Sequence, residues 1–319
     1  MIITQSDFNK NLNKNFIFEK FPKIAVAVSG GPDSMALVFL LKSWILKNNG
    51  SLIALIVDHQ IRKDSNLEAK IIKKYLIKYE IESKIFKVNK KNVIKKTMNE
   101  ARKNRFYELF NFCNRKRIFH LFVGHHFDDN LETYLLRKLA GSNFEGLRCM
   151  QQKFIIENIQ ILRPLLLFNK KNILSYNKSN KIYYIKDPSN KNLKYSRIVV
   201  REFLLDGNEF TQQIKKEFEV IQNYFPKYKK MIFSIFNKIS IDISKSKILI
   251  NGNFLNKYDF EIQIKIIEII YKFLKPHKIN LRYQKILHFM ELLNNRKILS
   301  SNLGGMNITK DILLITFCV

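Results

Sequence analysis

The chain has 319 residues, of which 56 are Lys or Arg, 27 are Asp or Glu, and 46% are apolar. This balance supports a folded core and excludes a wholly disordered chain. Chains longer than about 250 to 300 residues tend to divide, so we predict two domains of unequal size.

The formal net charge of +29 predicts a polyanionic partner, and an extended nucleic acid fits this charge better than a small acid. An alternative source for part of the excess positive charge is a lysine-rich proteome, since 44 of the 56 basic residues are Lys. Cys113, Cys149 and Cys318 are far apart and form no CxxC pair, which is typical of a reducing compartment. No apolar run has the length of a membrane span, so we expect a cytoplasmic protein without a membrane partner.

The first two thirds of the sequence alternate short apolar runs with amphipathic segments. The runs at 24–28, 52–57, 84–88 and 118–123 are predicted strands. Helical spacing of apolar residues occurs between them at 35–46, 66–79 and 101–110. The alternation predicts an α/β fold with a doubly wound parallel sheet, which we assign to residues 1–205.

The pattern changes in the last third of the chain, which we assign to a second domain at 206–319. Apolar residues have helical spacing at 209–239, 259–273 and 281–293, while 247–250 and 312–317 are predicted strands. We therefore expect a smaller, mainly helical C-terminal domain with a small sheet.

The first functional motif is the loop SGGPDS at 29–34, which lies between a predicted strand and a predicted helix. Two adjacent glycines allow backbone N–H groups to approach phosphate oxygens, and a helix N-terminus adds positive charge. The carboxylate of Asp33 can hold a magnesium ion that bridges the phosphates. The alternative is a plain Gly-Pro turn with a polar helix cap. The candidate ATP-binding residues of this loop are Ser29, Gly30, Gly31, Pro32, Asp33 and Ser34.

The second motif, GHHFDDNLETYLLRKLAGS at 124–142, follows the predicted strand 118–123 directly. With a helix beginning near Asp128, Asp129 and Glu132 share a face, and His125 lies in the preceding loop. Carboxyl ends of neighbouring parallel strands meet at one edge of a sheet, so we expect this motif beside the SGGPDS loop. Two alternatives are ordinary helix capping by the acids and a metal site formed by His125, His126 and Asp129.

These motifs carry a resemblance to known enzymes. The SGGPDS loop resembles that of the N-type ATP pyrophosphatases, which have an adenine nucleotide alpha hydrolase-like fold. The second motif narrows the resemblance to the tRNA(Ile)-lysidine synthase family. Further blocks are similar to that family and occur in its order: VDHQIR at 57–62, ARKNRF at 101–106, RPLL at 163–166, and DPSN leading to RIVVR at 187–201. The chain departs from the family pattern at Asn130, in AGSN at 140–143, and at Ile198.

The resemblance implies a reaction and its substrates. ATP activates the wobble cytidine of the isoleucine tRNA with a CAU anticodon, and free L-lysine then displaces AMP from the adenylated base. It implies ATP and Mg²⁺ as cofactors and a C-terminal domain that binds tRNA. The oligomeric state is left open, with a homodimer as one alternative.

The resemblance also implies roles for individual residues. Expected catalytic residues are Asp33, Arg105, Asp129 and Glu132, with Asp33 as the metal ligand. Gly124 and His125 join the ATP-binding residues. Lysine is expected to contact Asp129, Glu132 and a guanidinium, for which Arg197 and Arg201 are both candidates. The candidate tRNA-binding residues are Arg115, Arg117, Arg137 and Arg148.

Three other functions use similar sequence features. A tRNA thiolase needs a cysteine pair or an iron–sulfur cluster, and the spacing of Cys113 and Cys149 does not favour one. An amidating ligase needs ammonia from a glutaminase, whose nucleophile region the chain lacks. An RNA-binding module that keeps a nucleotide fold without turnover would release no pyrophosphate in response to lysine and tRNA.

Overall fold

A computed structural model describes residues 3–58, 65–87, 98–156, 158–185, 196–276, 281–295 and 298–319, with side chains left undescribed at Lys87, 98–105 and Ser196. The predicted blocks at 59–62 and 187–190 lie outside the described residues. The chain divides into two compact units, Met1–Glu219 and Val220–Val319. The boundary expected near residue 205 stays a prediction.

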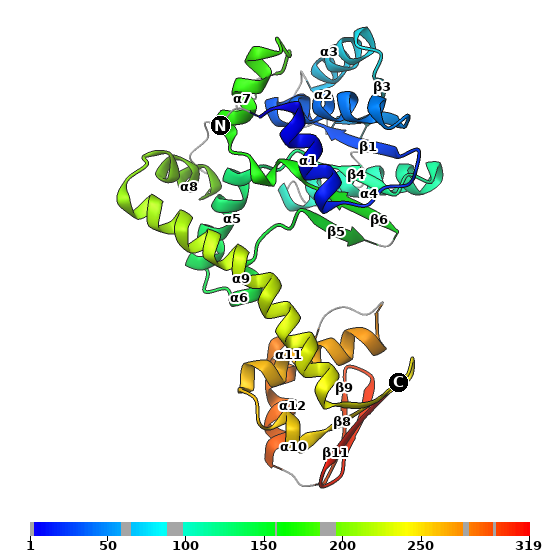
Figure 1. Ribbon diagram of the computed structural model, residues 1–319, viewed down its shortest axis with the longest axis vertical. Coiled ribbons are helices and arrows are strands. Elements are labelled where there is room, and N and C mark those ends of the chain that lie inside the picture. The colour runs from blue at the N-terminus through cyan, green and yellow to red at the C-terminus, as the bar shows by residue number, and fades with distance from the viewer. Residues whose placement is uncertain are drawn as a thin grey trace. The chain divides into compact units, whose positions relative to one another are not determined.

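The first unit is built on a six-stranded sheet with the strand order β3-β2-β1-β4-β6-β5 (Figure 1). Neighbouring strands are parallel except β5, which is antiparallel to β6 at the edge. The strands are β1 (Lys23–Val28), β2 (Ser51–Asp58), β3 (Glu82–Lys87), β4 (His120–Phe122), β5 (Lys153–Ile156) and β6 (Ile159–Leu162).

Successive residues of a strand point to opposite faces of the sheet, and in this sheet buried apolar residues point to both faces. Helices therefore cover both faces. Ile24 and Val26 of β1 face a core shared with α1, α2, α3 and α7. Ala25 faces the opposite core, where Leu109 and Phe112 of α4 cover the sheet. The helices are α1 (Gln5–Asn15), α2 (Pro32–Lys47), α3 (Ser65–Lys78), α4 (Met98–Lys116), α5 (Phe127–Leu139), α6 (Phe144–Leu147), the 3-10 turn η2 (Pro164–Leu167), α7 (Lys170–Ser179) and α8 (Ser196–Leu205).

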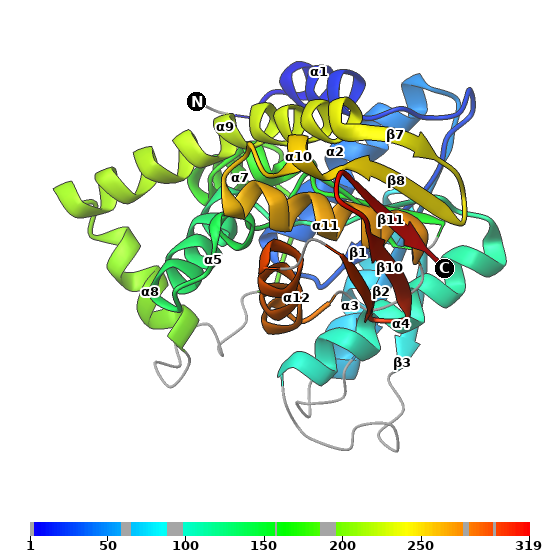
Figure 2. The same cartoon turned by 90° about the horizontal axis from the view of Figure 1, so that it is seen from below.

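The second unit contains a five-stranded antiparallel sheet with the order β7-β8-β11-β10-β9 (Figure 2). Its core joins strand residues such as Ile250 and Phe317 to Ile267 of α11 and Met290 of α12. The elements are β7 (Ser240–Ile243), β8 (Lys247–Asn251), α10 (Gly252–Leu255), α11 (Phe260–Leu274), α12 (Tyr283–Asn295), β9 (Leu299–Leu303), β10 (Met306–Lys310) and β11 (Leu314–Cys318). Helix α9 (Glu209–Ile239) runs across the boundary between the units.

The predicted fold class is confirmed, and the prediction was incomplete in its detail. The four predicted strands of the first unit are β1 to β4, and the predicted C-terminal helices are α9, α11 and α12. The sequence analysis missed the hairpin β5–β6, helices α1, α6, α7 and α10, the turn η2, and three strands of the C-terminal sheet. In the described part of the chain, every helix is too short or too polar to cross a lipid bilayer.

Helix α2 allows a matched test of the first core. Leu40 is fully buried, whereas Leu46 on the same helix is 65% exposed. We expect Leu40→Ala to lower the free energy of unfolding by about 2 to 5 kcal/mol, because it leaves a cavity in the first core. Urea denaturation measures this loss. Leu46→Ala is the control, and an equal loss in both variants would contradict the packing described.

Candidate functional site

The loop between β1 and α2 is shaped by its glycines and serines. Gly30 has a φ of +81°, and an added Cβ would lie 3.0 Å from Cγ1 of Ile72. A side chain at this position would therefore be strained and crowded. Ser34 Oγ donates to the carbonyl of Gly31 at 3.0 Å and accepts from the N–H of Ser29 at 3.2 Å. These bonds hold a tight turn at the positive end of α2.

Gly124 brings the second motif against this loop. It follows β4, the parallel neighbour of β1. A Cβ on Gly124 would lie 3.1 Å from the backbone N of Ser34 and 3.2 Å from the carbonyl carbon of Asp33. The backbone after β4 therefore touches the first turn of α2, so the two motifs meet at the carboxyl edge of the sheet, as the sequence predicts.

His126 lies between the acids of the two motifs. It is 4% exposed and caps α5: its Nδ1 accepts from the N–H of Asp129 at 3.4 Å, while its own N–H donates to Asp129 Oδ2 at 3.1 Å. Its Nε2 lies 3.8 Å from Asp33 Oδ1 and 3.5 Å from Asp129 Oδ2. The sequence analysis chose His125 and gave His126 only an alternative role; the available signal was its position directly before the helix.

Asp33 is paired with a lysine that the sequence analysis did not single out. Lys170 Nζ lies 2.6 Å and 2.7 Å from the two carboxylate oxygens of Asp33. The backbone N–H of Lys170 donates to Asp128 Oδ2 at 2.6 Å, which fixes the start of α7 beside the start of α5. The expected metal ligand therefore has a cation partner from a segment far along the chain.

Two half-exposed arginines form a cluster around the buried carboxylate of Glu132. Glu132 is 1% exposed, and Nε of Arg197 donates to its Oε2 at 2.8 Å. Arg201 donates to both carboxylate oxygens, from Nε to Oε1 at 2.5 Å and from the second guanidinium nitrogen to Oε2 at 3.1 Å. Asp129 Oδ1 lies 3.7 Å from Arg197 and 3.8 Å from Arg201. Both candidate arginines thus contact the same acid.

The charges of this cluster shift its pKa values. Burial would raise the pKa of Asp129, but the neighbouring imidazoles of His126 and His125 and the hydrogen bond from the backbone N–H of His126 hold it below its ordinary value. The hydrogen bond to Glu132 raises the pKa of Arg201. Asp129 and the guanidinium of Arg201 are therefore charged together.

The remaining predicted residues are placed as follows. Arg105 lies in α4, and its side chain is outside the described part of the structure. Arg115 and Arg117 are exposed at the end of α4. Arg137 on α5 donates to the carbonyl of Gly146 at 2.6 Å, and burial lowers the pKa of Arg148. Among the described residues, no group of three or more His, Cys, Asp or Glu is arranged to hold a metal by itself.

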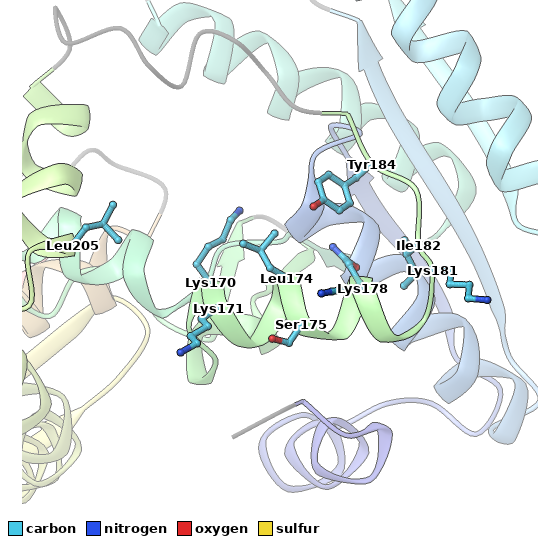
Figure 3. A pocket seen from close by; sticks show the side chains of 10 residues that line it. Lys170, Lys171, Leu174, Ser175, Lys178, Lys181, Ile182, Tyr184 and Leu205 are labelled. Atoms are coloured by element: carbon cyan, nitrogen blue, oxygen red, sulfur yellow. The ribbon is translucent and has the colours of Figure 1, made fainter.

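A cavity of about 610 Å³ lies along α7 (Figure 3). It is bordered by Lys170, the lysine that pairs with Asp33. Lys170, Leu174 and Asn177 of α7 line it, together with Tyr184 and with Leu205 of α8. The side-chain N–H of Asn177 donates to the carbonyl of Pro32 at 2.8 Å, so the cavity adjoins the start of α2.

Comparison with known proteins agrees with this geometry. The PP-loop domain family matches residues 4–207. A U34-tRNA thiolase from Methanococcus maripaludis has a similar fold, with a TM-score of 0.57 and 19% identity over 69% of this chain and 80% of that chain. The fold and the loop therefore define a PP-loop protein.

Curated relatives narrow the family. The chain is 30% identical to the tRNA(Ile)-lysidine synthase of Rickettsia typhi, over 97% of this chain and 72% of that protein. It is 34% identical to the enzyme of the same name from Orientia tsutsugamushi, over 66% of this chain and 49% of that protein. The chain belongs to the tRNA(Ile)-lysidine synthase family. It spans about half the length of several curated relatives that it matches.

Removing the charge of Glu132 should weaken the cluster. We expect Glu132→Gln to lower the free energy of unfolding by about 2 to 4 kcal/mol, because it leaves two guanidinium groups without their acid; the partial exposure of the arginines keeps the loss below that of a fully buried pair. Chemical denaturation measures it. Glu202→Gln, at an exposed position of α8, is the control. Equal stability of both variants would argue against the cluster.

The pKa of Asp129 leads to a pH-dependent prediction. A carboxyl whose folded pKa is lowered stabilises the protein above its unfolded value of about 3.9 and loses that contribution as the pH falls through the folded value. Between about pH 6 and about pH 2.5, wild-type protein should therefore lose more unfolding free energy than Asp129→Asn. Denaturation at the two pH values checks this, with exposed Asp206→Asn as the control. Identical losses in Asp129→Asn and wild type would refute it.

Proposed function

We propose that this chain joins free L-lysine to the 2-position of the wobble cytidine in the isoleucine tRNA with a CAU anticodon, consuming ATP and releasing AMP and pyrophosphate. Family membership supports the reaction class. The observation that carries the proposal is the contact between the two motifs. Asp33 lies 3.8 Å from His126, His126 lies 3.5 Å from Asp129, and Asp129 lies 3.7 Å from Arg197. A nucleotide site and an amino-acid site would thus share one edge of the sheet.

In the proposed first step, the cytosine oxygen attacks the α-phosphate and pyrophosphate leaves. Negative charge builds on the leaving group, and fixed donors aimed at that charge lower the barrier. The backbone of Gly30 and Gly31 and the N-terminus of α2 are suited to this task. The proposal also retains Arg105 on α4, and His125 and Gly124 beside the nucleotide.

The residues at Asp33 fit a magnesium ion. Magnesium in nucleotide enzymes is usually held by one or two carboxylates together with substrate phosphates and water, so it needs no all-protein cage. The side chain of Asp33 is 24% exposed and stands at the start of α2 beside the glycine loop. When bound, the ion would neutralise charge on the phosphates. Asp33 is the residue that would hold it.

In the proposed second step, the lysine ε-amine displaces AMP from the adenylated base. The amine must lose a proton first, because a lysine of pKa about 10.4 is almost fully protonated near neutral pH. Asp129 is ionised and partly exposed, whereas Glu132 is buried. Asp129 is therefore the better placed of the two carboxylates to hold the ammonium group and to accept its proton. Glu132 would orient Arg197 and Arg201, whose remaining N–H groups can pair with the α-carboxylate of the substrate.

The tRNA substrate is proposed from the family and the charge. A wobble base must leave its stack to reach a pocket of this kind, and the surrounding stem needs a basic surface. The net charge of +29 supports the presence of such a surface. Arg115, Arg117, Arg137 and Arg148 remain the proposed contacts from the first unit, and the second unit is the proposed C-terminal tRNA-binding domain.

The cysteines support a thiolase-like function less well than the rest of the site supports lysidine formation. Sulfur transfer uses thiolates, which form readily only where the pKa is lowered. Burial raises the pKa of Cys113 to about 12 and that of Cys149 to about 11. These thiols are therefore suited to packing rather than to reaction.

The proposed reaction can be tested directly. Purified protein incubated with ATP, Mg²⁺, radiolabelled lysine and a transcript of the isoleucine tRNA should place label on cytidine. We expect Asp33→Ala and Asp129→Ala to lower the rate by about 100-fold or more, because each removes a group that acts on the reacting atoms. Nucleoside analysis after digestion measures the product.

Asp206→Ala, at an exposed position just after α8, is the matched control and should keep the wild-type rate. Label on another base, or on no nucleoside at all, would overturn the proposed function. A near-normal rate in Asp129→Ala would remove the role assigned to that carboxylate.

A further inference from the structure

The position of Lys170 points to a role that no motif assigns. Its ammonium group contacts both oxygens of Asp33, the residue that occupies the start of α2 where a polyphosphate would bind. Asp33 alone would repel phosphate groups, and the lysine neutralises it. The pair therefore lies at the point where an incoming nucleotide would bring several negative charges.

The backbone of Lys170 is fixed while its side-chain end can move. Asp128 accepts from its backbone N–H at 2.6 Å, and Asn177, two turns along α7, binds the carbonyl of Pro32. The side chain of Lys170 is 37% exposed and borders the cavity along α7. A flexible four-carbon chain on a fixed backbone can carry its charge from one anion to another nearby.

We propose that Lys170 exchanges partners when nucleotide binds: its ammonium leaves Asp33 and binds the β- and γ-phosphates of ATP. The exchange is favourable because a polyphosphate carries more negative charge than one carboxylate, and charge-assisted bonds to phosphate are strong. Asp33 is thereby released to hold the magnesium that accompanies ATP. The proposal rests on the ATP-dependent function above and adds a phosphate-binding residue to it.

Lys171 provides a matched control on the same helix. It is exposed, and Figure 3 shows its amine on the opposite side of α7 from that of Lys170. A general effect of positive charge on nucleotide binding would appear equally in both lysines. An effect of the Asp33 pair would appear only at Lys170.

The test measures binding of ATP and AMP with Mg²⁺ by calorimetry, without lysine or tRNA, so that no turnover occurs. We expect Lys170→Gln to raise the Kd for ATP by about 10- to 100-fold and to leave the Kd for AMP unchanged, since AMP lacks the β- and γ-phosphates. Lys170→Arg, which keeps the charge, should stay within about threefold of wild type, and Lys171→Gln should match wild type.

Two results would overturn the inference: unchanged ATP affinity in Lys170→Gln, or an equal loss of ATP and AMP affinity, which would indicate a purely structural ion pair. If Lys170→Gln does not fold, the ratio of ATP affinity to AMP affinity is compared between Lys170→Arg and wild type. A large loss of ATP affinity in Lys170→Arg would contradict a role based on the charge of the lysine. Wild-type protein that binds ATP but forms no lysidine would refute the proposed function and leave this inference intact. Wild-type protein that does not bind ATP would refute both.

Discussion

The site depends on one close approach, between the backbone of Gly124 and the first turn of α2. The parallel pairing of β1 with β4 places the two strand ends side by side. Beyond this pair the sheet continues through β2 and β3 on one side and through β6 and β5 on the other, so β1 and β4 flank the point where the strand order reverses, which is where open α/β sheets bind their ligands. Any side chain at 124 would press on the backbone of Asp33 and Ser34 and separate the two loops.

Around this contact, each acid of the site has a cationic or imidazole partner from another segment. Lys170 of α7 pairs with Asp33, and the arginines of α8 pair with Glu132. Carboxylates gathered at one edge of a sheet would otherwise repel one another, and burying them unpaired would cost several kcal/mol. The pairing offsets this repulsion and holds the elements α5, α7 and α8 together.

The sequence predicted what is local and missed what is assembled at long range. Buried apolar runs and the glycine loop identified β1, β2 and the start of α2 without a structure. Lys170 could not be found this way, because it lies 137 residues from Asp33 and is one of 44 lysines in the chain. The strands β9 (LSSNL) and β10 (MNITK) are short and polar, so they depend on pairing, β9 with β10 and β10 with β11, rather than on a local pattern.

The charges around Glu132 explain why an acidic side chain, rather than a neutral one, occupies this buried position. Glu132 with Arg197 and Arg201 leaves one positive charge, and Asp129 adds a negative charge 3.7 Å from the nearer guanidinium. A positive and a negative group side by side are complementary to a ligand that carries both a carboxylate and an ammonium group. Without Glu132, the two guanidinium groups would repel each other and lose their fixed direction. The buried acid thus sets the geometry of the arginines, and Asp129 remains the acid within reach of solvent and ligand.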